Sequence, residues 1–271
     1  MLAPVESVQD LWLRAPDVGP PVLGGPLAAG PEPADADDGE FWAEQRARVI
    51  AAGRRRPVAA ATALAQERAK LTGADPNLEK GDAEAERPAY RRGRGGTAVG
   101  RAVHAVLQTV DLATGDGLDA TARAQALAEG VPERETEIRA LAASALQAPV
   151  VRTAVEQGRA RWREVPVAAM VDGVLVEGFV DLLIDTSDGL VVVDYKTDQV
   201  PSEAELDAAV ARYSVQGAAY AVALETALAR PVARCVVVFA RAAGAVEREV
   251  ADLSAAAAGV RALLPAFAGL D

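Results

Sequence analysis

Apolar positions follow two different spacings along the chain, and each spacing predicts one kind of element. Apolar residues recur every three or four positions in four segments, which predicts helices at about 97–113, 119–129, 133–147 and 150–158. Shorter apolar runs predict strands at about 160–170, 174–185, 190–196, 234–240 and 246–250. Three further helices are expected. One begins at the capping pair Ser202 and Glu205, one lies at about 212–229 and one at about 254–268. This order predicts an α/β fold with a mixed sheet and helices on its faces.

The first third of the chain has a different pattern. Residues 15–39 are rich in Pro, Gly, Ala and Asp, and residues 71–96 are polar, so both read as irregular segments. Between them, residues 40–70 have the apolar spacing of a helix. We therefore expect a partly helical, partly mobile extension over 1–95 and one domain over 96–271.

A β-hairpin is the sharpest local prediction. The apolar runs Val180–Ile184 and Leu190–Val193 flank a Ser-Asp-Gly turn signal. Asp181 then lies on the first strand and Asp194 ends the second. Because side chains alternate along a strand, Lys196 points to the same face as Asp194.

Two carboxylates and an ammonium at one edge of this hairpin are suited to a metal centre. Oxygen ligands favour Mg²⁺ or Mn²⁺, and Lys196 would hold a water or neutralise charge on a phosphate. Asp194 follows Leu-Val-Val-Val, and a charge at the end of such a buried run is costly unless it is paired or bound to metal. The alternative is a structural ion pair between Asp194 and Lys196.

Further candidates lie outside the hairpin. His104, the single histidine, lies on an amphipathic helix, where a structural role is the common alternative. Glu164 lies on a predicted strand and could reach a metal or orient the lysine, or be a surface charge. Gln216 and Tyr220 share one helical face. Gln216 could hold a phosphate or the lysine, and Tyr220 could stack on a base, bond a phosphate or simply pack on the sheet.

Composition and charge narrow the class of protein. The chain has 271 residues, 51% of them hydrophobic, and no apolar run near the roughly 20 residues needed to span a membrane. With no signal-peptide pattern at the N-terminus, we expect a cytoplasmic protein. Cys235 is the single cysteine, so a four-cysteine iron–sulfur cluster is excluded. The net charge of −11 does not favour strong intrinsic DNA binding, although arginines cluster within 46–56 and 87–101.

Five motifs in order resemble the RecB-like branch of the PD-(D/E)XK nuclease superfamily. They are GRAVHAVL with His104, REVPV with Glu164, GFVD with Asp181, VVDYKTD with Asp194 and Lys196, and RYSVQGAAY with Gln216 and Tyr220. The resemblance runs from about residue 95 to 239. It implies a restriction-endonuclease-like core and is strongest to the C-terminal nuclease domain of AddA- and RecB-type helicase–nucleases.

That resemblance implies roles for particular residues. His104, Asp181, Asp194 and the carbonyl of Tyr195 would bind Mg²⁺ or Mn²⁺. Lys196 would position or activate water, and Glu164 would support it. A further set, on the helix that steers the nucleic-acid strand, would bind substrate: Arg212, Tyr213, Gln216 and Tyr220.

The function implied is a metal-dependent (exo)deoxyribonuclease, the nuclease part of a helicase–nuclease that processes DNA ends in double-strand break repair. Exonuclease and endonuclease action both stay open. The substrate would be single-stranded DNA fed by a helicase domain or subunit, because this chain has no G-x-x-x-x-G-K-[ST] loop of its own. The chain would then be a fragment or separately encoded part of a helicase–nuclease. The alternatives are a stand-alone nuclease on other nucleic acids, including RNA, and a non-catalytic module that binds DNA or a partner.

Overall fold

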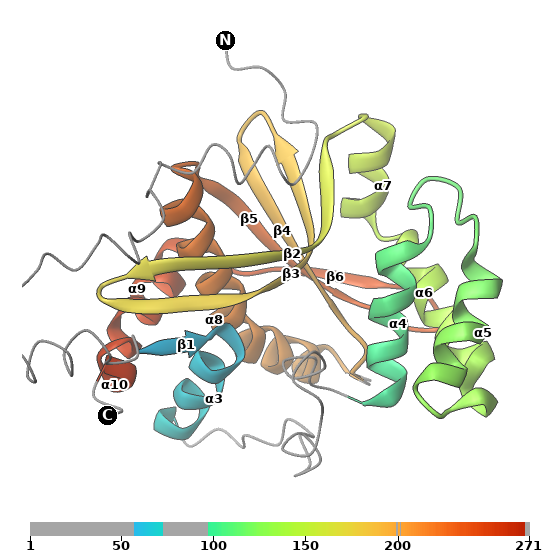
Figure 1. Ribbon diagram of the computed structural model, residues 1–271, viewed down its shortest axis with the longest axis horizontal. Helices are drawn as coiled ribbons and strands as arrows, with labels where there is room; N and C mark the ends of the chain where they lie inside the picture. The colour runs from blue at the N-terminus through green and yellow to red at the C-terminus, as the bar shows by residue number, and fades with distance from the viewer. Residues whose placement is uncertain (1–56, 73–96, 199, 201, 269–271) are drawn as a thin grey trace, which may run out of the picture.

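The computed structural model describes residues 57–72, 97–198, 200 and 202–268. Six strands in this part of the chain form one sheet (Figure 1). The strands are β1 (Val58–Ala60), β2 (Arg161–Val171), β3 (Val174–Thr186), β4 (Gly189–Lys196), β5 (Val232–Phe239) and β6 (Val246–Glu249).

Helices lie between β1 and β2, between β4 and β5, and after β6. They are α3 (Ala61–Thr72), α4 (Ala98–Thr109), α5 (Leu118–Ala128), η3 (Pro132–Arg134, a 3₁₀ turn), α6 (Glu135–Leu146), α7 (Pro149–Glu156), α8 (Glu203–Leu228), α9 (Leu253–Leu263) and α10 (Pro265–Ala268). Within the described residues, no helix is both long and apolar enough to span a membrane.

Strand β3 is the centre of the sheet. It pairs with β2 along one edge, and with β1 and then β4 along successive stretches of the other. The sheet is mixed, because β1–β3 and β4–β5 are parallel while the other neighbours are antiparallel. A parallel pair needs a crossover connection, and α8 supplies the one between β4 and β5.

Apolar side chains cover both faces of the sheet. One cluster joins the sheet to α3, α8 and α9, with Leu64, Leu206 and Phe239 fully buried. The second joins the other face to α4, α5, α6 and α7, with Val106 and Ile138 fully buried. Figure 1 shows these two helical layers on opposite sides of the strands. The predicted mixed α/β architecture is confirmed.

Three local predictions were wrong. Val58–Ala60 was expected to be helical but forms β1, because it pairs in parallel with β3, and α3 begins only at Ala61. The helix capped by Ser202 and the one predicted at 212–229 are a single helix, α8. The closing helix is divided into α9 and α10 at Pro265, whose ring lacks the N–H that would continue it.

The remaining elements agree with the prediction to within a few residues. Several predictions lie outside the described residues: the irregular segment 15–39, the part of the predicted helix before residue 57, residues 73–96 of the polar segment 71–96 and most of the two arginine clusters. The domain division at residue 96 stays a prediction. Strand β1 and helix α3, which precede it, belong to the sheet and to the core shared with α8.

Candidate active site

Strands β3 and β4 stop pairing at the point where Asp181 and Asp194 face each other. Their register runs from Thr186 opposite Gly189 to Leu182 opposite Val193, and the next pair would be the two aspartates. Instead, Oδ2 of Asp181 accepts a hydrogen bond from the backbone N–H of Tyr195, at 2.7 Å. The carboxylate thus occupies the opening between the strands, and it replaces a backbone acceptor there.

Glu164 lies on the other side of Asp181. The β2–β3 register places it between the pairs Arg163–Leu182 and Val165–Val180, directly across from Asp181. Its φ is 50°, in the left-handed region that a side chain with a Cβ rarely adopts. Such strain concentrates at functional sites. Strand β2 therefore departs from regular strand geometry at the residue that faces Asp181.

His104 reaches the site from α4. Thr97 caps this helix by accepting the N–H of Gly100 at 3.0 Å. A Cβ on Gly100 would lie 2.9 Å from Oγ1 of Thr197, so the glycine allows α4 to pass close to the segment after β4. One turn further on, Nδ1 of His104 lies 3.0 Å from Oδ1 of Asp181.

These three residues form a candidate cation site. The ligand atoms of His104, Glu164 and Asp181 all lie within 4.8 Å of one another. Two carboxylates and one imidazole are a suitable donor set for Mg²⁺ or Mn²⁺. When Nδ1 of the histidine donates to a carboxylate, its Nε2 is left with the lone pair that a metal needs. The residues present therefore fit a divalent cation.

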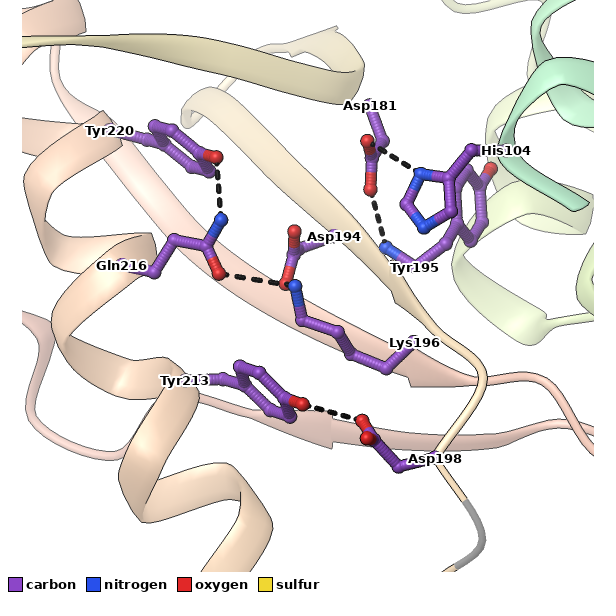
Figure 2. A network of polar contacts seen from close by, with 9 residues as sticks. All are labelled: His104, Asp181, Asp194, Tyr195, Lys196, Asp198, Tyr213, Gln216 and Tyr220. Atoms are coloured by element: carbon purple, nitrogen blue, oxygen red, sulfur yellow. Dashed lines mark hydrogen bonds and ion pairs between the residues drawn. The ribbon is translucent and has the colours of Figure 1, made fainter. Parts of the chain in front are cut away.

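A second polar chain starts at Asp194, which is 4% exposed (Figure 2). Its Oδ2 lies 2.7 Å from Nζ of Lys196, so the two side chains share one face as predicted. Nζ of Lys196 also donates to Oε1 of Gln216 at 3.1 Å. The amide of Gln216 in turn donates to the hydroxyl of Tyr220 at 2.7 Å. Helix α8 thus fixes the lysine from the side opposite α4.

Tyr213, on α8, also contacts the lysine. Nζ of Lys196 lies 4.4 Å from the centre of the Tyr213 ring, within the range of a cation–π contact. The hydroxyl of Tyr213 donates to Oδ2 of Asp198 at 2.5 Å. Asp198 was not among the predicted site residues. Its signal is its position two residues after Lys196 in the same DYKTD segment.

Gly178 is a second residue that sequence reasoning missed. A Cβ at this position would lie 2.5 Å from Cε1 of Tyr220. A glycine inside a strand often marks a close approach of this kind. It lets the Tyr220 ring lie against β3, where its hydroxyl meets Gln216.

Burial and charge act together on the acid–base groups. Burial lowers the pKa of His104, but Asp181 outweighs it and the net pKa is raised. Burial raises the pKa of Asp181, but His104, Lys196 and the Tyr195 N–H outweigh it and the net pKa is lowered. Burial likewise lowers the pKa of Lys196, and the carboxylates of Asp194 and Asp181 reverse that shift. Lys196 is therefore held as an ammonium.

Not every predicted role is matched by a contact. Asp194 is not one of the three residues in the candidate cation site. Burial and the charge of Asp181 raise its pKa, and the opposing effect of Lys196 does not cancel this shift. Arg212 is exposed on α8. Tyr195 contributes its N–H to Asp181, and its buried ring meets that of His104 edge to face at 6.4 Å. Metal binding by Asp194 and by the Tyr195 carbonyl, and substrate binding by Arg212, stay predictions.

Comparison with known proteins supports the resemblance. The model of the PD-(D/E)XK nuclease superfamily matches residues 78–267. The chain is 40% identical over 174 residues to an ATP-dependent helicase/nuclease subunit of Desulforudis audaxviator (strain MP104C), covering 54% of this chain and 14% of that protein. This chain thus spans only a small part of that relative's length. A solved structure, "Crystal structure of SSO0001", shares 10% identity over 85% of this chain and 87% of its own, with a TM-score of 0.35, too low to support any conclusion.

Proposed function

This chain belongs to the PD-(D/E)XK nuclease superfamily, and we propose that it is a Mg²⁺- or Mn²⁺-dependent deoxyribonuclease. One observation carries the proposal. His104 and Glu164 meet Asp181 on one side of the opening between β3 and β4, and Lys196 meets Asp194 and Gln216 on the other. A cation-binding donor set and a fixed ammonium side by side are what hydrolysis of a phosphodiester needs.

The residue roles in this proposal follow from their contacts. His104, Glu164 and Asp181 would hold the cation, with Asp194 and the Tyr195 carbonyl as further ligands. When bound, a divalent cation supplies Lewis acidity to the scissile phosphate and to water.

Lys196 would donate its N–H groups to the attacking water or to a phosphate oxygen. Three groups restrict its position: the carboxylate at 2.7 Å, the Gln216 amide at 3.1 Å and the Tyr213 ring at 4.4 Å. A donor held in place in this way does not have to reorganise as negative charge develops.

We further propose that the nuclease acts on DNA ends during double-strand break repair, as part of a helicase–nuclease in the cytoplasm. The name of the relative from Desulforudis audaxviator supports a helicase partner. A strand delivered by a helicase would be single-stranded. Delivery by a partner also suits a chain with a net charge of −11, because weak intrinsic DNA affinity is then sufficient.

The test is cleavage of end-labelled single- and double-stranded DNA with Mg²⁺ or Mn²⁺. Asp194→Ala and Lys196→Ala should abolish cleavage, while Asp188→Ala in the exposed hairpin turn should not. A circular single strand that resists cleavage would indicate an exonuclease. Equal cleavage by wild type and Lys196→Ala would refute the proposed centre.

The ion pair favours a second candidate function. Because Asp194 and Lys196 satisfy each other at 2.7 Å, they could be structural in a module that binds DNA or a partner without cleaving it. Isothermal titration with Mn²⁺ separates the two. Metal binding together with cleavage supports the nuclease, and DNA binding without either supports the module.

A further inference from the structure

Three arginines precede the acid of β2 at alternate positions. Arg159, Arg161 and Arg163 lead directly to Glu164, one of the three residues of the candidate cation site. Arg161 and Arg163 are alternate residues of β2 and share a face, while Arg159 lies two residues before the strand begins. That face is the one next to the end of α4. The Arg163 guanidinium donates there to the carbonyls of Leu107 and Val110, at 3.3 and 2.5 Å.

These arginines line a cavity of about 330 Å³, which we call the arginine pocket. The lining also includes Asp111, the one carboxylate among these residues. That carboxylate already accepts the backbone N–H groups of Ala113 and Thr114, at 2.8 and 2.7 Å. With three guanidinium groups against one carboxylate, the pocket has an excess of positive charge in a chain whose net charge is −11.

The guanidinium group determines what such a pocket can bind. It is always charged, has only donors, and matches the paired oxygens of phosphate or carboxylate. The cavity is at the lower end of the volumes that bind small molecules, about 300–1,000 Å³. A phosphate with its neighbouring sugar is therefore a suitable occupant.

The distance to the candidate cation site favours a nucleic-acid phosphate. At about 3.3 Å per strand residue, Arg161 is about 10 Å along β2 from Glu164. Arg159, two residues before β2 begins, is at most about 16 Å away along the chain. Stacked nucleotides rise by about 3.4 Å each, so three to five nucleotides cover this distance. We propose that the arginine pocket binds a backbone phosphate of the strand whose cleaved phosphodiester lies at Asp181. This inference rests on the proposed nuclease function and adds a substrate-binding site to it.

The test replaces Arg159 and Arg161 together by Gln in the full chain. Arg163 is left intact, because its bonds to the α4 carbonyls are structural. The matched control is Arg234→Gln with Arg261→Gln, which removes the same charge from two exposed ion pairs on β5 and α9. Exposed pairs of this kind contribute little to stability.

Binding is measured with a fluorescent single-stranded 12-mer, with Lys196→Ala added to every protein to prevent cleavage. The pocket variant should bind about tenfold more weakly than the control, since a hydrogen bond to a charged group is worth about that factor. The slope of log K against log salt should fall by about 0.7 for each phosphate no longer neutralised. Equal affinities of the pocket variant and the control would overturn the proposal.

Cleavage separates this inference from the proposed function. In proteins with Lys196 intact, the ratio of kcat/KM for the 12-mer to kcat/KM for bis(4-nitrophenyl) phosphate should fall about tenfold in the pocket variant. If the wild type cleaves neither substrate but 12-mer binding still depends on Arg159 and Arg161, the proposed nuclease function is refuted and the proposed phosphate-binding site is supported. If both substrates are cleaved and the ratio is unchanged in the pocket variant, the nuclease function is supported and the proposed phosphate-binding site is refuted.

An acidic protein segment is the competing occupant. A labelled poly-glutamate peptide tests it with the same variants. Loss of peptide binding with unaltered 12-mer binding in the pocket variant would show that the arginines bind carboxylates, and it would overturn the proposal.

Discussion

Gly178→Ala should damage the lysine network without touching any of its polar groups. The new Cβ would lie 2.5 Å from Cε1 and 3.3 Å from Cδ1 of Tyr220, and 3.4 Å from Cβ of Ala61. To restore an ordinary carbon–carbon contact, the ring must retreat by about 1 Å. Tyr220 is 4% exposed and is held within the core shared by β3 and α8, so it has little room to move.

The magnitude follows from overpacking and from displacement. An extra methyl in a filled core costs about 2 kcal/mol of unfolding free energy, which lowers Tm by about 4–8 °C in a protein of this size. Moving the ring also moves the hydroxyl that holds Gln216, and with it the acceptor of Lys196. A misplacement of about 1 Å in a catalytic group can reduce the rate by about 100-fold.

The assay is thermal unfolding followed by single-strand cleavage, with two comparisons. Gly259→Ala on α9 adds a methyl that meets nothing within 4 Å, and it should raise stability slightly because alanine favours helices. Tyr220→Val removes the ring, so Gly178→Ala should cost much less in that background, which is a coupling that a double-mutant cycle measures. Unchanged Tm and kcat in Gly178→Ala, or equal costs in both backgrounds, would refute the reasoning.

Three other predictions concern separate parts of the site. Asp181→Asn should weaken Mn²⁺ binding at least tenfold in a calorimetric titration, because it removes a charged ligand; an unchanged affinity would contradict the assignment. Asp198→Ala should lower kcat more than Asp198→Asn, since the amide oxygen still accepts the Tyr213 hydroxyl; equal losses would contradict this role. Burial raises the pKa of the Cys235 thiol, so Ellman's reagent should modify it only after unfolding, and rapid modification of the native protein would contradict its burial.

The sequence predicted the hairpin and its chemistry because short-range rules determine both. A Ser-Asp-Gly turn between two apolar runs leaves one register available, and alternation along β4 then places Asp194 and Lys196 on one face. The capping box of α8 is equally local, and Ser202 and Glu205 make both of its hydrogen bonds. Predictions of this kind need no knowledge of which segments meet in space.

Contacts between distant segments could not be predicted in the same way. Val58–Ala60 is apolar and rich in alanine, so helical spacing was a reasonable interpretation until β3 offered a free edge to pair with. The positive φ of Glu164 is a second example, because no neighbouring glycine or turn residue signals it. The residue that Glu164 faces, Asp181, is 17 residues further along the chain.

Two glycines allow α8 to pack closely against the sheet. A Cβ at Gly217 would overlap Sγ of Cys235 on β5, and one at Gly178 would lie 2.5 Å from the Tyr220 ring. Each marks a place where helix and sheet are in contact without space for a methyl group. Gln216 lies next to the first glycine in the chain, and Tyr220 lies against the second. The hydrogen bonds that link Lys196 to Gln216 and Tyr220 on α8 therefore depend on two residues without a functional group. A search for polar motifs alone would miss these glycines.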